Sequence, residues 1–204
     1  MNGSAIGYYG ADAGTGPFGS GLVEDLEPGD DFLAEVVADW EAEARRAEAA
    51  GIRVAMLRTG VVLSPAGGML QQVLPLFLAG VGGPIASSGG ESHDGSPWLS
   101  WIGADDIAGA FAHAVLDDGV TGPVNAVAPE LVTAREFATV LGRVLRRPAA
   151  VPTPGFGPRL LLGAEGAEET VRADQKAVAD RLLASGYAMR DPELEGALRH
   201  VLGR

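Results

Sequence analysis

Three segments near the start of the chain constrain the fold more than any other feature. The first, 4–10, is a short apolar run that ends in a glycine turn, and the third, 52–57, is a mostly apolar run with β-branched members. Between them a helix is predicted over 32–50. A strand, a helix and a second strand in this order form a right-handed crossover unit of a parallel sheet. The order therefore predicts an α/β fold.

The predicted helix over 32–50 carries its own start and stop signals. Asp31 offers a side-chain N-cap, and Gly51 stands at the C′ position. Its apolar side chains recur at helical spacing, which predicts that they share the buried face: Phe32, Val36, Trp40, Ala44 and Ala47.

Further elements follow in mixed order. Thr133 and Glu136 form a capping-box pattern ahead of a helix, and Pro75 is expected to bend or end a helix over 68–78. Other patterns predict a strand over 98–102, then a helix from Asp105 or Asp106 that buries Ile107, Phe111 and Val115, and then a strand over 124–127. An extended connector is predicted at the prolines Pro148, Pro152, Pro154 and Pro158. The tail is predicted to hold a helix ending at Gly186, a strand over 187–189 and a last helix from Asp191 with Pro192 at N1. We expect a sheet domain over 1–129 and a small α-rich lobe over 130–204.

The charge and the missing residue types exclude several classes of function. The 204 residues carry a net charge of −12, so neither nucleic acid nor an anionic membrane is an expected partner. The chain has no cysteine, which excludes disulfides, thiolate catalysis and thiolate zinc sites. His93, His113 and His200 lack metal-ligand spacing, and no G-x-S-x-G motif of a serine hydrolase is present. No secretory signal or membrane-length apolar segment is visible, so a cytoplasmic protein is predicted.

A set of short motifs occurs in a fixed order along almost the whole chain. The motifs are Ser4-Ala-Ile-Gly-Tyr-Tyr-Gly10, Gly29-Asp-Asp-Phe-Leu-Ala-Glu35, Trp40-Glu41, Leu57-Arg-Thr-Gly-Val-Val-Leu-Ser-Pro65, Gly82-Gly-Pro84, Ser100-Trp-Ile-x-x-Asp-Asp106, Gly122-Pro-Val-Asn125 and Ser185-Gly-Tyr187. Together they resemble the sugar-nucleotide-epimerase-like branch of the extended short-chain dehydrogenase/reductases. That branch carries a C-terminal domain of unknown function, DUF1731.

The resemblance implies a Rossmann-type fold, a cofactor of the NADP type and a C-terminal substrate lobe. It also implies a first strand, a glycine-rich turn and a helix whose N-terminus holds the cofactor's pyrophosphate. No G-x-G-x-x-G pattern follows a strand in this chain, and the nearest match, Gly14-Thr15-Gly16-Pro17, lies in an acidic loop. We therefore expect the C-terminal part of a Rossmann-type parallel sheet, from a protein shortened at its N-terminus and lacking the phosphate site.

The resemblance also implies a way of acting on the substrate. The superfamily uses a Ser or Thr at the end of the first strand seen here, where Ser4 stands, and a Y-x-x-x-K pair on the next helix. Phe32 and Val36 occupy the places of that pair, and the single lysine, Lys176, is far away. The standard proton transfer by Tyr and Lys cannot be carried over.

Tyr8 and Tyr9 are the candidate replacements for the missing phenol. Both follow the first strand at the carboxyl edge of the sheet, where such folds bind ligands. Ser4, Tyr8 and Tyr9 are therefore the predicted catalytic residues. The competing interpretation is that Ser4 is a turn serine and that the two tyrosines only pack or lie exposed.

Cofactor contacts are predicted at the end of the second strand. In the family, the segment of Thr59, Gly60 and Val61 passes the nicotinamide end of the cofactor. Arg58 is a candidate for bidentate contact with a phosphate or carboxylate, and a salt bridge to an acidic neighbour is the alternative.

Substrate contacts are predicted for two tryptophans. Trp98 and Trp101 are candidates for stacking on a ring, with a place in the core as the alternative. Asp105 and Asp106 match an acidic pair of the family, although N-capping explains at least one of them. Gly103 stands where the family usually has His.

These observations predict an NAD(P)-dependent epimerase or oxidoreductase. Its substrate would be a small molecule, either a nucleotide sugar or a small carbonyl or hydroxyl compound. The alternatives are a non-catalytic nucleotide-binding or regulatory module, which the missing Tyr-Lys pair favours, and an inactive fragment.

Overall fold

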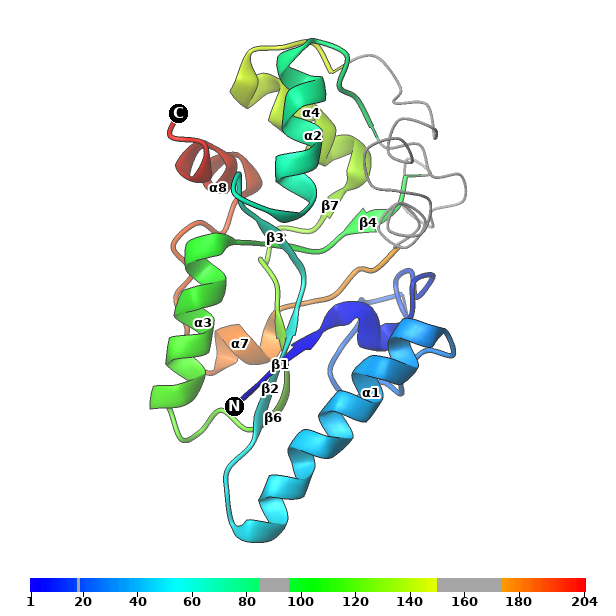
Figure 1. Cartoon of the computed structure of the whole chain (residues 1–204), viewed down its shortest axis with the longest axis vertical. Helices are drawn as coiled ribbons and strands as arrows, with labels where there is room; N and C mark the ends of the chain where they lie inside the picture. Colours follow the sequence, from blue (N-terminus) through cyan, green and yellow to red (C-terminus); the bar gives the residue numbers. More distant parts are fainter. Residues whose placement is uncertain (18, 85–95, 150–173) are drawn as a thin grey trace.

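The structure is a computed structural model that describes residues 1–17, 19–84, 96–149 and 174–204 (Figure 1). Its strands are β1 (Asn2–Ala5), β2 (Ala55–Thr59), β3 (Val61–Leu63), β4 (Trp98–Leu99), β5 (Trp101–Gly103), β6 (Gly122–Ala126) and β7 (Val132–Thr133). Its α-helices are α1 (Phe32–Arg45), α2 (Gly68–Leu78), α3 (Ala104–Leu116), α4 (Ala134–Leu145), α7 (Asp180–Ala184) and α8 (Leu194–Val201). Two 3-10 helices, η1 (Ile6–Tyr9) and η2 (Arg46–Ala50), follow β1 and α1.

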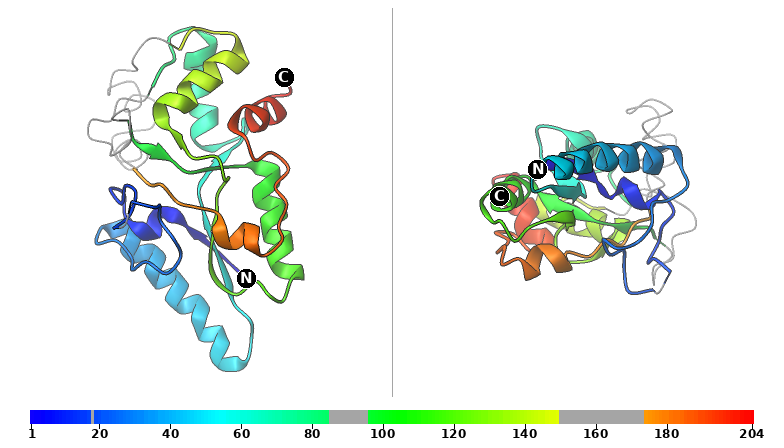
Figure 2. Two further views of the ribbon diagram at one scale, coloured as in Figure 1. Left: turned by 180° about the vertical axis from the view of Figure 1, so that it is seen from behind. Right: turned by 90° about the horizontal axis from the view of Figure 1, so that it is seen from below.

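The lower part of the molecule is a three-stranded parallel sheet in the order β1–β2–β6. Helix α1 covers one face of this sheet, and α3 and α7 lie on the other face (Figures 1 and 2). The register places Ser4 beside Arg58, and Arg58 beside Asn125. The predicted α/β class with a parallel sheet is confirmed.

The two faces of this sheet differ in chemical character, because successive residues of a strand point to opposite faces. Leu57 and Val124 pack against α3 and against Leu182 of α7 in an apolar cluster. Their neighbours Arg58 and Asn125 are buried on the other face, beneath α1 and η1. The α1 face of the sheet is therefore polar inside the protein.

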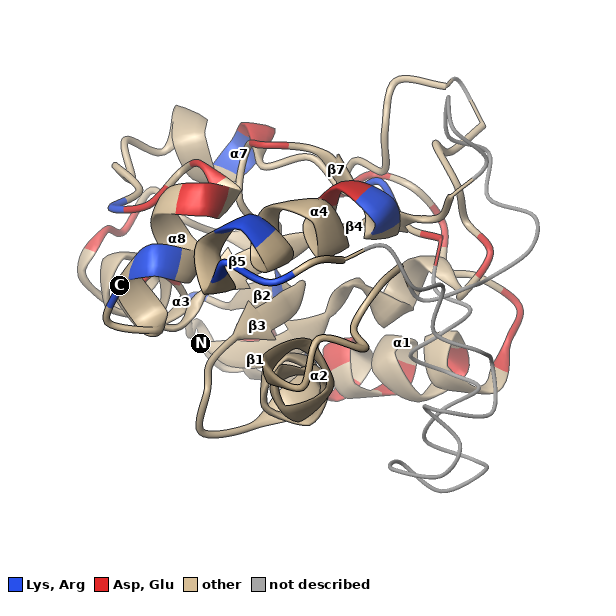
Figure 3. Cartoon of the chain, turned by 90° about the horizontal axis from the view of Figure 1, so that it is seen from above, with Lys and Arg blue, Asp and Glu red and all other residues tan. Residues whose placement is uncertain are grey.

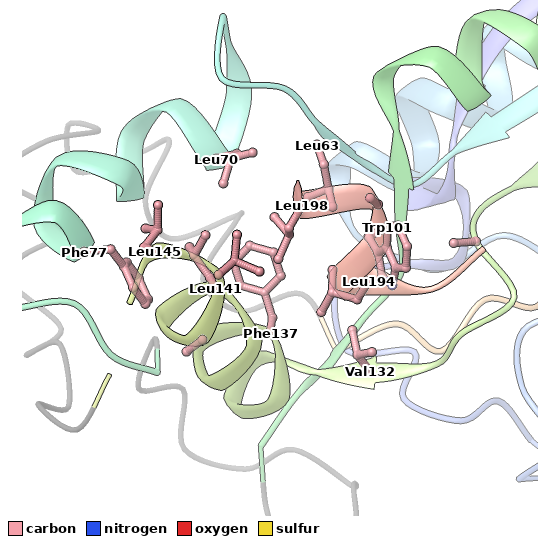
Figure 4. Close-up of a cluster of buried hydrophobic side chains, with 14 residues drawn as sticks. Leu63, Leu70, Phe77, Trp101, Val132, Phe137, Leu141, Leu145, Leu194 and Leu198 are labelled. Atoms are coloured by element: carbon pink, nitrogen blue, oxygen red, sulfur yellow. The ribbon is translucent and has the colours of Figure 1, made fainter. Parts of the chain in front are cut away.

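The upper part is built around a second apolar cluster (Figure 4). It joins α2, α4 and α8 to β3 and β5, which form a two-stranded parallel sheet. Its larger members are Leu63, Leu70, Phe77, Trp101, Val132, Phe137, Leu141, Leu145, Leu194 and Leu198. The cluster thus draws on residues from both sides of position 130.

One glycine carries the chain from the lower sheet to the upper one. The N–H of Gly60 donates to the carbonyl of Ala126, and the next N–H, of Val61, donates to the carbonyl of Ser100. A Cβ on Gly60 would lie 2.8 Å from the carbonyl oxygen of Ser100 and from Cγ1 of Val127. Position 60 therefore has no room for a side chain.

Two of the predicted helix caps, at the starts of α1 and α4, are confirmed. The side chain of Asp31 accepts a hydrogen bond from the N–H of Ala34 at 2.9 Å and caps α1. Thr133 and Glu136 form the reciprocal capping box at the start of α4. Pro75, however, does not end α2, which continues to Leu78. Pro75 is exposed, so water can reach the carbonyl that its ring leaves without a donor.

The prediction of the buried face of α1 is wrong. The buried residues are Ala34, Val37 and Glu41, whereas Phe32 is 72% exposed and Trp40 is 56% exposed. The physical reason is the ion pair of Glu41 with a buried arginine of the sheet, which the small neighbouring side chains allow to form. The larger apolar residues of the helix consequently face outward.

Two strand predictions need correction. The second strand runs over Ala55–Thr59, and Ile52 is exposed. The segment 98–102 is split into β4 and β5 at Ser100, whose hydroxyl binds the backbone of the 174–178 segment instead. The predicted connector from Pro152 to Pro158 lies outside the described residues.

The start of α3 and the tail of the chain also differ from prediction, for one shared reason. Asp106 does not cap α3, which begins after Gly103 and leaves Val115 exposed. Its buried carboxylate instead accepts the N–H groups of Arg190 and Asp191 at 2.7 and 3.0 Å. Because these contacts tie the tail to α3, 187–189 form no strand and α8 begins at Leu194 with Glu193 as N-cap.

Candidate functional site

A buried ion pair lies beneath α1 on the polar face of the sheet. Arg58, on the middle strand, is 1% exposed and Glu41 is fully buried. The pair is bidentate, with Nε donating to Oε1 at 2.8 Å and Nη2 donating to Oε2 at 2.9 Å. This geometry is the strongest one available to a guanidinium and a carboxylate.

The three predicted catalytic residues gather around this pair. The hydroxyl of Ser4 donates to Oε1 of Glu41 at 2.7 Å. Nη1 of Arg58 donates to the hydroxyl of Tyr9 at 3.1 Å, and Cζ of Arg58 lies 3.4 Å from the ring centroid of Tyr8. Tyr8 and Tyr9 therefore contact the arginine of the pair, whereas Ser4 contacts its carboxylate.

The network continues to the third strand of the sheet. Tyr9 donates its hydroxyl proton to Oδ1 of Asn125 at 2.7 Å. The backbone N–H of Asn125 donates to Oε1 of Glu24 at 2.9 Å, and its side-chain amide donates to the carbonyls of Leu22 and Val178. One chain of polar contacts thus crosses all three strands.

The charged groups of the network fall into two electrostatic situations. Burial alone would raise the pKa of Glu41, but hydrogen bonds from Arg58 and Ser4 outweigh it and hold that pKa below its ordinary value. Burial likewise opposes the charge of Arg58, yet Glu41 and Tyr9 hold its pKa above the ordinary value. Burial also raises the pKa of Glu24, whose nearest cation, Arg181, stands 3.7 Å away. Glu41 is a paired carboxylate, whereas Glu24 is a poorly compensated one.

The hydroxyl groups differ in what chemistry they can do. Ser4 already donates its proton to Glu41, which leaves its oxygen as an acceptor. Burial raises the pKa of Tyr9 to about 12, so its phenol keeps its proton near neutral pH. Within the described part of the chain, the hydroxyl of Tyr8 makes no hydrogen bond. Tyr8 is therefore the predicted catalytic residue whose hydroxyl remains uncommitted.

The predicted cofactor residues lie at the carboxyl edge of β2. Arg58 forms the salt bridge that was the alternative interpretation, and its Nη1 also donates to the carbonyl of Glu24 at 3.1 Å. Thr59, Gly60 and Val61 are half-buried, and the N–H groups of Gly60 and Val61 are used within the fold. Because both donors of its ion pair are committed to Glu41, Arg58 is not free to pair with a phosphate as the sequence analysis allowed.

The two predicted substrate residues belong to the upper part of the molecule. Trp101 has no exposed surface and donates its indole N–H to the carbonyl of Glu130 at 3.1 Å, so it occupies the core. Trp98 is half-buried in β4, with Nζ of Lys176 5.0 Å from its ring centroid. Neither tryptophan is part of the network around Arg58.

Sequence reasoning assigned no role to Glu24, Glu41 and Asn125, which belong to the network. It also assigned none to Gln175, which hydrogen-bonds the backbone beside it. Glu24 and Asn125 come from a loop and a short strand, and Gln175 comes from the C-terminal region. Glu41 was visible as part of the Trp40-Glu41 motif, and its spacing of seven from Ala34 and four from Val37 places it on the buried face of α1. That spacing was the available signal.

The described residues form neither a metal-binding group nor a membrane-spanning helix. Among them, no three His, Asp or Glu side chains gather into a metal-binding group. His113 bonds Ser185, and His200 bonds Asp105, each at 2.9 Å, while His93 lies outside the described residues. In the described part of the chain, no helix has the length and apolarity required to cross a membrane.

Known proteins share both the sequence and the fold. Residues 153–201 match the domain of unknown function DUF1731. The chain is 36% identical over 204 residues to Epimerase family protein Mb2239 of Mycobacterium bovis, covering all of this chain and 64% of that protein. It is 36% identical over 202 residues to Epimerase family protein SDR39U1 homolog, chloroplastic, of Arabidopsis thaliana, covering 99% of this chain and 54% of that protein. The chain thus spans less than two thirds of the length of these relatives.

Two solved structures extend the comparison. The human epimerase family protein SDR39U1, solved with NADPH, has a TM-score of 0.77 and 32% identity, and the match covers 98% of this chain and 64% of that one. The nucleoside-diphosphate sugar epimerase of Corynebacterium glutamicum has a TM-score of 0.73 and 36% identity, with 100% and 37% covered. The fold is therefore Rossmann-type, and the predicted resemblance to the epimerase-like branch of the extended short-chain dehydrogenase/reductases that carries DUF1731 is confirmed.

Proposed function

We propose that the chain is part of an epimerase or oxidoreductase that depends on a nicotinamide dinucleotide. The observation that carries the proposal is the 32% identical human relative, whose structure contains NADPH. The network around Arg58 supports it, because it lies at the carboxyl edge of a parallel sheet, where ligands of such folds bind. The name of the Corynebacterium glutamicum relative points to a nucleotide sugar as the substrate class.

The residues of this chain have distinct roles in the proposed site. A bound dinucleotide supplies the hydride chemistry. Thr59, Gly60 and Val61 line the place for its nicotinamide end, and Tyr8 presents the uncommitted hydroxyl that exchanges a proton with the substrate. Arg58 holds the ring of Tyr8 from one side through a cation–π contact of 3.4 Å. The family resemblance favours NADP over NAD.

The pyrophosphate of the cofactor needs donors other than Arg58. The glycine-rich phosphate loop implied by the resemblance does not occur among these 204 residues. We propose that full dinucleotide affinity requires polypeptide that carries such a loop. Calorimetric titration of NADPH into this chain, and into a fusion that places a glycine-rich strand–turn–helix segment before it, tests this. We expect at least 100-fold tighter binding by the fusion, and equal affinities would contradict the proposal.

A turnover assay tests the role of Tyr8. The fusion is screened at 340 nm for hydride transfer with nucleotide sugars and small carbonyl compounds. Tyr8→Phe is expected to reduce kcat by a factor of about 100 or more, the range of a lost general acid–base residue, without weakening NADPH binding. Tyr187→Phe is the matched control, because Tyr187 bonds Asp106 on the far side of the sheet. Equal loss in the two variants would count against Tyr8.

A non-catalytic nucleotide-binding module is the second candidate. It is favoured by the committed hydroxyl groups of Ser4 and Tyr9 and by Phe32, which stands at the place of the family tyrosine and is 72% exposed. Tight NADPH binding by the fusion, with no turnover across the screen, would support this candidate.

The proposed partner is a small-molecule substrate, and the proposed location is the cytoplasm. The Arabidopsis thaliana relative, by contrast, is named chloroplastic. Fractionation of cells that express a tagged chain at its native level tests the location.

A further inference from the structure

A short segment near the C-terminus lies between two parts of the chain that are distant from it in sequence, and it hydrogen-bonds to both. This segment, Asp174–Val178, is called the strap below. On one side its backbone bonds the loop that follows η1: the N–H of Asp174 donates to the carbonyl of Ala11 at 2.7 Å, and the N–H of Gly14 donates to the carbonyl of Asp174 at 2.6 Å. Further along, Lys176 bonds Gly14 and Leu22 at 2.9 and 2.7 Å.

The other side of the strap is held by β4 and Ser100. The N–H of Trp98 donates to Oδ1 of Asp174 at 2.7 Å. The hydroxyl of Ser100 donates to the carbonyl of Gln175 at 2.7 Å and accepts from the N–H of Ala177 at 2.8 Å. The strap therefore behaves as a strand with both of its edges occupied.

The loop that follows η1 is shaped to receive the strap. Gly21 has a φ of +114°, and a Cβ there would lie 2.6 Å from Cγ1 of Val178 and 3.1 Å from the carbonyl oxygen of Lys176. Only glycine allows the two backbones to approach so closely in this conformation.

The side chain of Gln175 reaches from the strap to η1. Its amide nitrogen Nε2 donates to the carbonyl of Gly10 at 2.6 Å and to the carbonyl of Ile6 at 3.2 Å. Ile6 is the first residue of η1 and Gly10 follows its last, so the two carbonyls lie at the two ends of the segment that carries Tyr8 and Tyr9. Gln175 is 6% exposed, so water cannot replace its two hydrogen bonds at low cost.

A four-residue 3-10 helix has few hydrogen bonds of its own and depends on outside contacts for its shape. Besides Gln175, η1 is held by the N–H of Gly29, which donates to the carbonyl of Tyr8 at 2.9 Å. The phenol of Tyr9 and the ring of Tyr8 then meet Arg58. The position of both rings therefore depends on how the strap holds η1.

We propose that Gln175 is a positioning residue: it fixes η1, and through η1 it sets Tyr8 and Tyr9 against Arg58. The C-terminal region that matches DUF1731 thereby determines the geometry of a site to which the described residues of that region contribute no reacting group. The functional meaning of this arrangement rests on the proposed function, whereas the structural part stands without it.

Amide hydrogen exchange on the 204-residue chain tests the structural part. Gln175→Met keeps a similar volume and removes both donors. We expect the N–H groups of Gly10 and Gly29 to exchange at least 10-fold faster, while the N–H groups of β2, including Leu57, keep their protection. Gln72→Met, at an exposed position of α2, is the matched control and should change neither set.

Two outcomes would overturn the proposal. One is unchanged exchange at Gly10 and Gly29, and the other is an equal increase in exchange across β2, which would mark a general loss of stability. Should Gln175→Met not fold, Ser100→Ala loosens the opposite side of the strap and keeps Gln175. The same local increase, smaller in size, is then expected, and its absence would also overturn the proposal.

A second readout separates positioning from a purely structural role. In the fusion that turns over substrate, Gln175→Met should lower kcat about 10-fold and leave the KM for NADPH within twofold. Unchanged kcat in a folded variant would contradict positioning of Tyr8. If the wild-type fusion shows no turnover, the proposed function fails, while the exchange experiment still decides whether Gln175 fixes η1.

Discussion

The two outer edges of the three-stranded sheet differ in how many hydrogen bonds they make with the rest of the protein. At the β6 edge, the N–H of Asn125 is taken by Glu24, and its side-chain amide holds the carbonyls of Leu22 and Val178. At the β1 edge, the side chain of Asn2 makes an exposed hydrogen bond to the carbonyl of Trp40 at 3.5 Å. Within the described residues, no other strand pairs with β1 besides β2.

The difference shows where the fold is closed and where it is open. The covered edge is sealed by buried polar groups from a loop, a helix and the strap. The open edge lies next to α1, whose larger apolar side chains, Phe32 and Trp40, face outward. A bare strand edge beside exposed apolar side chains is the kind of surface that natural proteins usually cover.

The largest effect is expected where the network meets the middle strand, because the ion pair there supports both edges. Glu41→Ala leaves the guanidinium of Arg58 buried without its carboxylate, which is expected to cost about 3–5 kcal/mol of unfolding free energy. Urea denaturation measures this loss. Arg45→Ala removes the half-exposed partner of Glu41 and should cost less than about 1 kcal/mol. Similar losses of unfolding free energy in the two variants would mean that the buried ion pair contributes no more to stability than the half-exposed one.

A smaller effect is expected from the two asparagines, which compare the edges directly. Asn125→Ala removes three side-chain hydrogen bonds of the covered edge, two of them buried and one partly buried, and is expected to cost about 2–3 kcal/mol. Asn2→Ala at the open edge should stay within about 0.5 kcal/mol of the wild type. Thermal unfolding of both variants checks the contrast, which fails if Asn2→Ala costs as much as Asn125→Ala.

The alkaline stability of the chain reports the covered edge through Tyr9. Because its pKa is raised from 10.0 to about 12 in the folded state, the unfolded chain loses this proton first. Stability should therefore fall as the pH rises through this range, by about 1 kcal/mol between about pH 9 and pH 11 from this group. Tyr9→Phe should show a shallower decline in denaturation measured against pH. An identical decline in both proteins would place Tyr9 in contact with water.

The smallest effect on stability is expected at the open edge itself. Trp40→Glu alters an exposed side chain and should change the unfolding free energy by less than about 0.5 kcal/mol. Figure 3 shows acidic residues along α1, so the new charge adds to a like-charged surface. Light scattering should show that the wild type self-associates as its concentration rises and that Trp40→Glu does so less. A wild type that stays monomeric at all concentrations would argue that the open edge is inert.

Local signals in the sequence predicted the parts of the fold that local chemistry decides. Asp31 and the pair of Thr133 and Glu136 marked helix starts correctly, because a cap involves only neighbouring residues. The order of elements predicted the parallel sheet. The face of α1 was predicted wrongly, since a count of apolar residues could not reveal that Glu41 has a buried partner 17 residues away.

The candidate site was predictable only in part, for a related reason. Ser4 was found through the family resemblance, whereas Tyr8, Tyr9 and Arg58 were found because they stand at the ends of two predicted strands, and ends of parallel strands meet. Asn125, although part of a quoted motif, and Gln175 were given no role because the contacts that define them span 116 and 169 residues. No periodic pattern links positions so far apart, and these residue types are common in loops and strands.

The strap has a consequence for how proteins of this kind can be recombined. The segment matching DUF1731 supplies the strap, Leu182 to the lower apolar cluster and Leu194 to the upper one. Its described residues pack into both clusters and hydrogen-bond the rest of the chain, so the segment is not a separable module. A graft that swapped this segment between two family members would have to import the receiving surfaces as well, above all the loop around Gly21. Gene shuffling with a crossover just before the segment that matches DUF1731 should thus yield few chimeric proteins that fold.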